Sequence, residues 1–110
     1  MAVIYVAHEY GGKEENYNKA KKITHDLQIQ HPTDCFICPI LAFSHLGYNE
    51  LGYDAEMEIC LDLLSVCDKL IVASEVSNSK GVQIEVDFAK LVDMEVEYIE
   101  PQNPGRCDEQ

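Results

Sequence analysis

The strongest chemical candidate in this sequence is a single carboxylate, Glu85, near the start of an expected helix. An apolar segment over residues 70–73 precedes it, and the run from 74 to 85 joins the two. Ser79 and Gly81 are residue types that suit a helix start, which places Glu85 about one turn inside the helix. A carboxylate held there can attack an electrophilic carbon or bind a ligand group.

The spacing around Glu85 predicts that its side chain points into the protein. Phe88, Ala89 and Val92 follow it by three, four and seven positions, so they share its helix face. Asp87 is rotated by about 200° and should face solvent. A carboxylate that faces inward must be hydrogen-bonded, paired or used, because burying it alone is costly. The alternative is that Glu85 caps backbone donors at the helix start.

The apolar pattern indicates which elements position this carboxylate. Residues 82–88 also alternate as a strand would, but a crossover helix is needed before the last strand. Asp54 suits the N-cap of the second helix. The polar stretch 101–110 predicts a loose tail, which limits the domain to residues 1–100. We expect strands over 3–7, 35–38, 69–73 and 96–99, and helices over 16–30, over 54–67 and from 81 onward.

The alternation of strands and helices predicts an α/β fold. Parallel strands joined by right-handed crossovers form a small three-layer sandwich, Rossmann-like or flavodoxin-like, with a parallel sheet of four to five strands. Ligands of such folds bind at the carboxyl ends of the strands. Residues 8–12, 39–53 and 74–81 follow strands at that edge. Asp68 precedes a strand at the opposite edge, so its expected role is a structural cap.

A long connection over residues 41–53 follows the second strand and is rich in aromatic side chains. Such a segment can close over a ligand as a lid. It can equally bury a neighbouring subunit, and we favour an interface that also borders the site. The aromatic residues are Phe43, His45, Tyr48 and Tyr53.

Composition and charge narrow the classes of partner. With 110 residues, 46% of them apolar, and a formal charge of −12, the chain reads as one acidic globular domain. This charge repels polyanions, which argues against nucleic acids and anionic membranes as partners. A small phosphorylated ligand stays compatible, because donors at a helix N-terminus outweigh distant screened charge. The chain offers no membrane-length apolar segment and starts with a strand, which predicts a cytoplasmic location.

The five cysteines, an odd number, indicate free thiols in a reducing compartment. Cys35 and Cys38 form a C-x-x-C, but the segment reads as a buried strand that ends at Pro39. No second pair completes a zinc site. Cys60 and Cys67 lie seven apart on one helix face and are expected in the core. We therefore predict no metal and no cofactor.

Four short motifs together resemble a known family. They are Ile4-Tyr5-Val6-Ala7-His8-Glu9-Tyr10-Gly11-Gly12, Cys38-Pro39, Cys67-Asp68 and Ser79-x-Gly81-x-x-x-Glu85-x-x-x-Ala89. Over about residues 3–99 the chain resembles the nucleoside 2-deoxyribosyltransferase-like superfamily, and most closely its short phage-associated branches. The resemblance implies a Rossmann-like fold, a homo-oligomer with shared sites, and a nucleoside or nucleotide-derived small molecule as the ligand.

The resemblance also implies roles for individual residues. Glu85 matches the glutamate that attacks the anomeric carbon of the ribosyl unit, and Ser79 matches a serine that binds the sugar or a 5′-phosphate. Three candidates have ordinary alternatives: Tyr5 as a core residue, His8 as a water-exposed loop residue and Lys80 as a solvated lysine. The residues expected to bind the ligand are Tyr5, His8, Glu9, Tyr10, Gly11, Pro39, Ser79, Lys80 and Gly81.

One position departs from the family pattern. Enzymes of this superfamily commonly place an aspartate on the second helix to assist proton transfer at the base, and here Cys60 stands in its place. A thiol is a weaker acid than a carboxyl group, so Glu56, Glu58 or Asp62 would have to substitute. Two functions stay open. One is an N-glycosidic hydrolase or (deoxy)ribosyltransferase with Glu85 as nucleophile; the other is a non-catalytic protein that senses or sequesters a nucleotide-derived messenger such as a cyclic ADP-ribose isomer.

Overall fold

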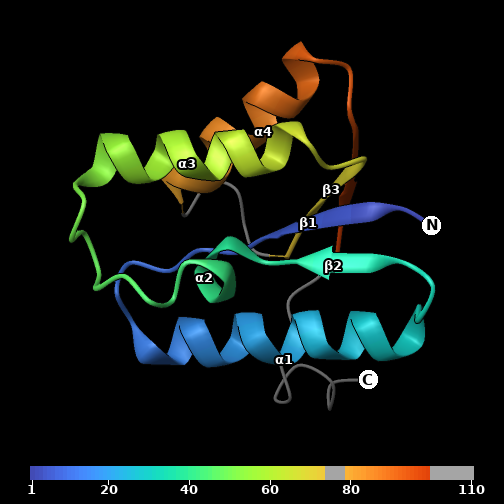
Figure 1. Cartoon of the computed structure of the whole chain (residues 1–110), viewed down its shortest axis with the longest axis horizontal. Coiled ribbons are helices and arrows are strands. Elements are labelled where there is room, and N and C mark those ends of the chain that lie inside the picture. Colours follow the sequence, from blue (N-terminus) through green and yellow to red (C-terminus); the bar gives the residue numbers. More distant parts are fainter. Residues whose placement is uncertain (74–78, 100–110) are drawn as a thin grey trace, which may run out of the picture.

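The computed structural model describes residues 1–73 and 79–99, in which strands and helices alternate (Figure 1). The run from 74 to 78 and the predicted tail over 101–110 lie outside the described residues. The elements are β1 (Val3–Ala7), α1 (Glu14–Gln30), β2 (Cys35–Ile37), α2 (Pro39–Ala42), α3 (Tyr53–Ser65), β3 (Lys69–Val72), α4 (Lys80–Leu91) and β4 (Glu95–Tyr98).

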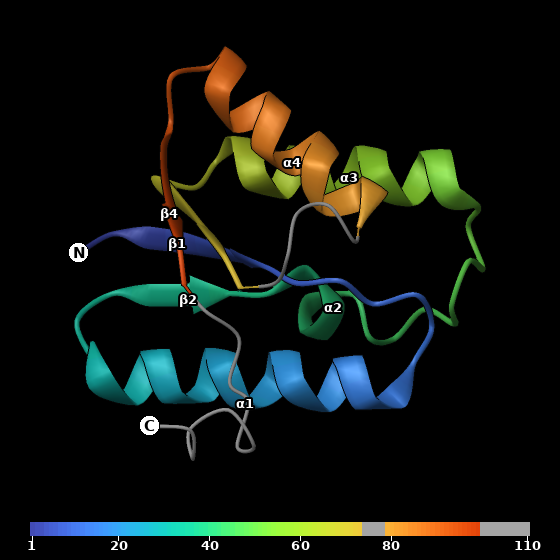
Figure 2. The ribbon, with the colours of Figure 1, turned by 180° about the vertical axis from the view of Figure 1, so that it is seen from behind.

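The strands of the described residues form one parallel sheet in the order β2-β1-β3-β4. Val3 of β1 pairs with Cys35 of β2, and Ile4 pairs with Lys69 of β3. Helices α1 and α2 lie on one side of the sheet, and α3 and α4 lie on the other, as opposite views show (Figure 1, Figure 2). The predicted three-layer α/β sandwich with a parallel, Rossmann-like sheet is confirmed.

Alternating side chains of β1 contribute to a core on each face of the sheet. Tyr5 and Ala7 belong to the cluster formed with α3 and α4, whereas Val6 packs with Ala20 and Ile23 of α1. The three strand residues are fully buried. Successive strand side chains point to opposite faces, and each fully buried apolar side chain stabilises the fold by roughly 1.5–3 kcal/mol. This packing on both faces fits the position of β1 inside the sheet, so its carboxyl end lies in the middle of the carboxyl edge of the sheet.

Two helix starts differ from the prediction. The connection after the second strand begins with the short helix α2, which the sequence reading had assigned to a loop; Pro39 occupies its first turn, where a missing N–H costs nothing. Helix α3 starts at Tyr53 with Gly52 as N-cap, so the assignment of Asp54 as N-cap was wrong. Asp54 instead lies in the first turn, where its charge complements the helix dipole.

The segment after Ser79 is a helix, as predicted, and not a strand. Helix α4 ends at Leu91, and Asp93 has the positive φ of 62° that turns the chain toward β4. Val92 is therefore the C-cap residue and is 48% exposed. The expectation that Val92 shares the buried face of Glu85 was wrong, because the helix stops before that turn is complete.

Two aspartates tie the amino end of β1 to neighbouring segments. The Val3 N–H donates to Asp68 Oδ2 at 2.8 Å, and the Ala2 N–H donates to Asp34 Oδ1 at 3.0 Å. These bonds satisfy backbone donors at the start of the central strand. The structural role expected for Asp68 is confirmed.

Candidate active site

A cavity of about 720 Å³ opens at the carboxyl edge of the sheet. Its wall combines the loop after β1, helix α2 with the connection that follows it, and the N-terminal parts of α1, α3 and α4. Because these three helices begin at the wall, their positive dipole ends lie there; α1 and α3 start on the left in Figure 1. The volume is within the range of small-molecule sites. The edge predicted to bind a ligand therefore carries a cavity of suitable size.

Glu85 of α4 lines this cavity although its side chain is only 5% exposed. The Tyr5 hydroxyl of β1 donates a hydrogen bond to Glu85 Oε2. Ser79 is the N-cap of α4, and its Oγ accepts the Val82 N–H at 3.2 Å. Ser79 therefore caps α4, and the alternative that Glu85 caps the helix start was wrong. The predicted inward direction of Glu85 and the exposure of Asp87 are both confirmed.

The surroundings of Glu85 change its acidity. Burial raises the pKa of Glu85 to about 7, against the hydrogen bond from Tyr5, which acts to lower it. Burial and the nearby Glu85 charge raise the pKa of Tyr5 well above its ordinary value. Tyr5 thus remains a hydrogen-bond donor at any ordinary pH, while Glu85 changes its charge near neutral pH. Such a carboxylate is ionised often enough to attack and is poorly solvated, which favours nucleophilic chemistry.

Cys60 of α3 occupies the wall beside this pair and is partly buried. Burial, followed by the Glu85 charge, raises the pKa of the Cys60 thiol to about 11. Cys60 therefore presents a neutral thiol to the cavity rather than belonging wholly to the core. Cys67 is the buried cysteine of that pair.

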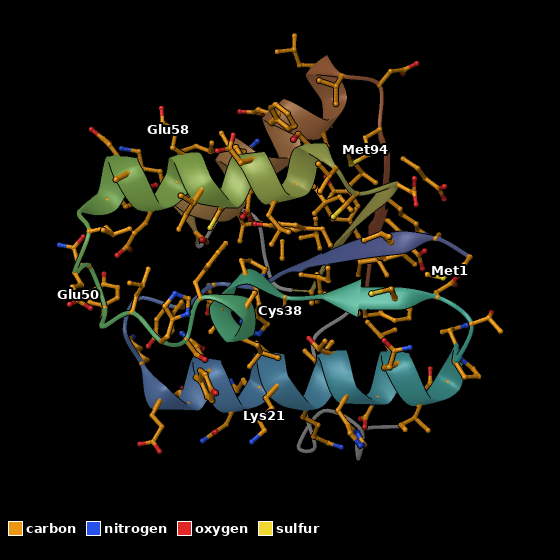
Figure 3. All side chains as sticks on the ribbon, viewed as in Figure 1. Met1, Lys21, Cys38, Glu50, Glu58 and Met94 are labelled. Carbon is orange, nitrogen blue, oxygen red and sulfur yellow. The ribbon has the colours of Figure 1, made fainter. Side chains whose placement is uncertain are left out.

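The carboxylates proposed as substitutes for the missing aspartate lie in different places. Glu56 lines the cavity, and its Oε2 accepts the Leu51 N–H at 3.2 Å. Glu58 and Asp62 are exposed, and Figure 3 shows Glu58 on the outer side of α3. Of these three, only Glu56 is placed to meet a ligand in the cavity.

The loop after β1 brings a buried histidine to the wall. His8 is 8% exposed, so the alternative of a water-exposed loop histidine was wrong. Its Nδ1 lies 2.7 Å from the Glu9 carbonyl oxygen. Because a carbonyl only accepts, the proton of a neutral ring is on Nδ1 and Nε2 is an acceptor. Asn16 holds the loop from α1, since its Nδ2 donates to the Tyr10 carbonyl at 2.9 Å.

Aromatic side chains close part of the cavity. The Tyr10 and Tyr48 rings meet edge to face, with centroids 5.7 Å apart. A Cβ on Gly12 would lie 2.9 Å from the Tyr48 ring, so the absence of a side chain there lets the ring approach the backbone. Phe43 and Tyr53 also line the wall. The connection over 43–53 is thus in contact with the loop after β1.

The structure brings nearly all predicted site residues together at one cavity. Tyr5 is the exception: it is fully buried in the core, and its hydroxyl meets the site through the hydrogen bond to Glu85. Lys80 is exposed at the first turn of α4, in agreement with a solvated lysine. The predicted residues that line the cavity are His8, Glu9, Tyr10, Gly11, Pro39, Ser79, Lys80, Gly81 and Glu85.

The wall residues that the sequence analysis did not predict include Lys13, Asn16 and Met57. Asn16 is the most informative, because a buried asparagine on the inner face of an amphipathic helix is unusual and could have been noticed. Within residues 1–73 and 79–99, no three His, Cys, Asp or Glu side chains form a metal-binding group. No helix in those ranges is long and apolar enough to cross a membrane.

Comparison with known proteins gives a family but no activity. No curated protein and no solved structure matches the chain significantly. Residues 2–98 match the family described as Domain of unknown function (DUF4406). The match covers both the sheet and the cavity wall, so the chain belongs to the DUF4406 family.

Proposed function

We propose that this protein cleaves the N-glycosidic bond of a nucleoside or nucleotide-derived molecule, with Glu85 as the nucleophile. The observation that carries the proposal is a nearly buried carboxylate in a cavity wall, held by the Tyr5 hydroxyl. The motif Ser79-x-Gly81-x-x-x-Glu85, with its resemblance to the nucleoside 2-deoxyribosyltransferase-like superfamily, supports the same assignment.

The reaction would proceed in two displacements. In the first, an oxygen of ionised Glu85 attacks C1′ of the sugar, the C1′–N bond breaks, and its electron pair leaves with the base nitrogen. In the second, water or an acceptor base attacks C1′, the ester bond breaks and the carboxylate is restored. His8 has an acceptor nitrogen that could take the proton of the attacking water.

Two features of the wall would position the substrate. Ser79 and Lys80 lie at the start of α4, where the helix dipole favours an anionic 5′-phosphate. Phe43 and Tyr48 of the connection after α2, with Tyr53 at the start of α3, would cover the base. The sugar would then lie between these two ends, next to Glu85.

A binding-only function is the second candidate, and Cys60 favours it. A neutral thiol beside Glu85 is a poor proton donor to a leaving base. Such a site would retain an intact nucleotide messenger, for example a cyclic ADP-ribose isomer, instead of cleaving it. The two functions predict different products from the same incubation.

We also propose that the protein is a homo-oligomer and is located in the cytoplasm. Tyr48, Leu51 and Tyr53 are 63%, 50% and 44% exposed beside the cavity, which suits a subunit contact that borders the site. Light scattering of the purified protein tests this part, and a monomer at micromolar concentration contradicts it.

The test is incubation of the protein with nucleosides, their monophosphates, NAD and cyclic ADP-ribose isomers, followed by chromatography before and after denaturation. Glu85→Gln is the matched variant, because it keeps the size and an acceptor oxygen for Tyr5 but cannot form the ester. Release of free base by the wild type alone supports catalysis. Intact nucleotide recovered only after denaturation supports sequestration and rejects cleavage.

A further inference from the structure

We infer that the group released by this site is a cationic nitrogen heterocycle, such as a pyridinium, rather than a neutral purine or pyrimidine. The inference rests on the proposed function, because it names the leaving group of the same reaction. It is carried by what surrounds Glu85: a thiol, carboxylates and aromatic rings.

The chemistry of the leaving group decides what the wall must supply. A neutral base becomes an anion when its C1′–N bond breaks, so an acid must protonate it. A pyridinium ring takes the electron pair of that bond, becomes a neutral pyridine and needs no proton. A site without a positioned acid therefore discriminates strongly between the two classes.

Among the described residues, the side chains of Cys60, Tyr5 and His8 do not provide such an acid. Cys60 holds a neutral, weakly acidic thiol. Tyr5 donates a hydrogen bond to Glu85 and lies behind the wall. His8 in its neutral form has already directed its proton to the Glu9 carbonyl, which leaves an acceptor nitrogen.

The remaining carboxyl groups of the described wall suit a cation better than an acid role. Glu9 and Glu56 are both partly exposed, and Glu56 Oε2 accepts the Leu51 N–H. Carboxylates at the wall attract a positively charged ring and repel an anionic leaving group.

Charge and aromatic surface agree with this assignment. Within residues 1–73 and 79–99, the wall carries three carboxyl groups, Glu9, Glu56 and Glu85, and the ammonium groups of Lys13 and Lys80, which are both exposed to screening water. The chain as a whole has a formal charge of −12. Among the described residues, the wall also includes five aromatic side chains, whose ring faces attract cations. They are Tyr10, Tyr17, Phe43, Tyr48 and Tyr53.

The resulting step balances without a co-reactant other than water. Glu85 Oε forms a bond to C1′, the C1′–N bond breaks, and its electron pair neutralises the ring nitrogen. Water then attacks C1′, the ester C–O bond breaks, and the proton of the water passes to the His8 acceptor nitrogen or to solvent. The products are the free sugar hemiacetal and a neutral pyridine.

The first experiment compares nicotinamide riboside, a pyridinium N-glycoside, with inosine, a neutral one. The measured quantity is kcat/KM divided by the uncatalysed rate of each compound, which removes their different intrinsic reactivity. We expect this acceleration to be at least about 100-fold larger for nicotinamide riboside, the contribution of a general acid being about 10²–10⁴-fold. Equal accelerations overturn the inference but leave the proposed function intact. Absence of release from both, with Glu85 intact, overturns both proposals.

The second experiment restores the missing acid. Cys60→Asp should raise the ratio of inosine to nicotinamide riboside turnover by at least about tenfold, and Cys60→Ser should leave the ratio unchanged. The ratio cancels losses common to both substrates. An unchanged ratio in folded Cys60→Asp contradicts the role assigned to this position.

A third measurement does not depend on catalysis or on a variant. 1-Methylnicotinamide, a pyridinium cation, and nicotinamide, its neutral counterpart, are titrated into the wild-type protein, and binding is followed by NMR. We expect the cation to bind about tenfold more tightly because of the ring faces and carboxylates. Equal affinity, or tighter binding of nicotinamide, overturns the recognition of a cationic ring.

Discussion

The two edges of the sheet use the same functional group in opposite ways. At the amino edge, the carboxylates of Asp34 and Asp68 accept backbone N–H groups of Ala2 and Val3. At the carboxyl edge, Glu85 is almost fully buried and its Oε2 accepts a hydrogen bond from the Tyr5 hydroxyl. A carboxylate bonded to backbone amides stabilises the fold, whereas a desolvated one with a raised pKa is suited to chemistry.

The difference follows from what each edge offers. The amino end of the central strand presents unpaired N–H groups that an exposed aspartate can satisfy while it remains in water. The carboxyl end meets helix starts and a cavity, and there Glu85 is kept from water by α3, α4 and β1. The comparison therefore predicts that substitutions at the two edges have effects of different kinds.

Turnover should respond to Glu85 and not to Asp68. Glu85→Gln removes the nucleophile, and we expect kcat to fall by about 10³-fold or more, as for other covalent catalysts. Asp68→Asn keeps an acceptor for the Val3 N–H and lies at the far edge, so kcat should stay within about twofold. The assay is release of free base under saturating substrate. Comparable losses in the two variants would remove the functional distinction between the edges.

Glu85 should lower the stability of the folded protein at high pH, whereas Asp68 should raise it at every pH. Between pH 4.5, the ordinary pKa of Glu85, and its folded value of about 7, the folded state binds more protons than the unfolded state. The free energy of unfolding therefore falls as pH rises through this window, by about 2–3 kcal/mol between pH 5 and pH 8. Glu85→Gln has no carboxyl group at this position to ionise, so the variant should be more stable than the wild type at pH 8.

Asp68→Ala provides the matched control for that measurement, because it leaves the Val3 N–H without its acceptor. We expect it to lower the free energy of unfolding by about 1 kcal/mol at both pH values. Urea denaturation at pH 5 and pH 8 measures both variants. A Glu85→Gln protein that is less stable than the wild type at pH 8 would show that Glu85 contributes to folding as Asp68 does.

The pH profile should depend on Tyr5. Ionised Glu85 is the reactive form, so kcat/KM should rise with pH and level off above about 7. Tyr5→Phe removes a hydrogen bond that lowers the pKa of Glu85, and the rising limb should move to higher pH by about one unit. At pH 6 this corresponds to about a tenfold loss. If the rising limb of the Tyr5→Phe profile stays at the same pH and kcat/KM is lower by the same factor at every pH, Tyr5 contributes through packing alone.

Substitutions at two neighbouring glycines distinguish the effect of backbone strain from the effect of contact with Tyr48 in the cavity wall. Gly11 and Gly12 both have positive φ, 62° and 75°, but only a Cβ on Gly12 would meet the Tyr48 ring. Alanine at either position should cost about 1 kcal/mol of stability. Only Gly12→Ala should also raise KM, by about two- to fivefold, since it displaces Tyr48. Equal KM values for the two variants would show that the Tyr48 contact does not affect binding.

The inward direction of Glu85 was predictable, whereas its partner was not. Ala89 lies one turn further on the same helix face and is fully buried, so local spacing was sufficient. Tyr5 is 80 residues away in the sequence, and its bond to Glu85 depends on the crossover that packs α4 against β1. No local pattern contains that information.

The sheet and its helices were also predictable, because strand alternation and helical spacing are strong over these segments. Helix α2 was missed because four residues are too few to show a period, and only Pro39 marks its start. Val92 was misplaced because the end of α4 is set by the turn at Asp93 and not by the apolar pattern. The predictions were therefore wrong where the structure depends on very short elements or on the turn that ends a helix.

The most direct test of the central claim is detection of the covalent intermediate. The protein is incubated with a 2-fluoro-substituted pentosyl N-glycoside of nicotinamide, which slows the second displacement, then quenched with acid and digested for mass spectrometry. We expect one pentosyl ester, on the peptide that contains Glu85, and none in Glu85→Gln. Release of nicotinamide without an adduct, or an adduct on another residue, would contradict Glu85 as the nucleophile.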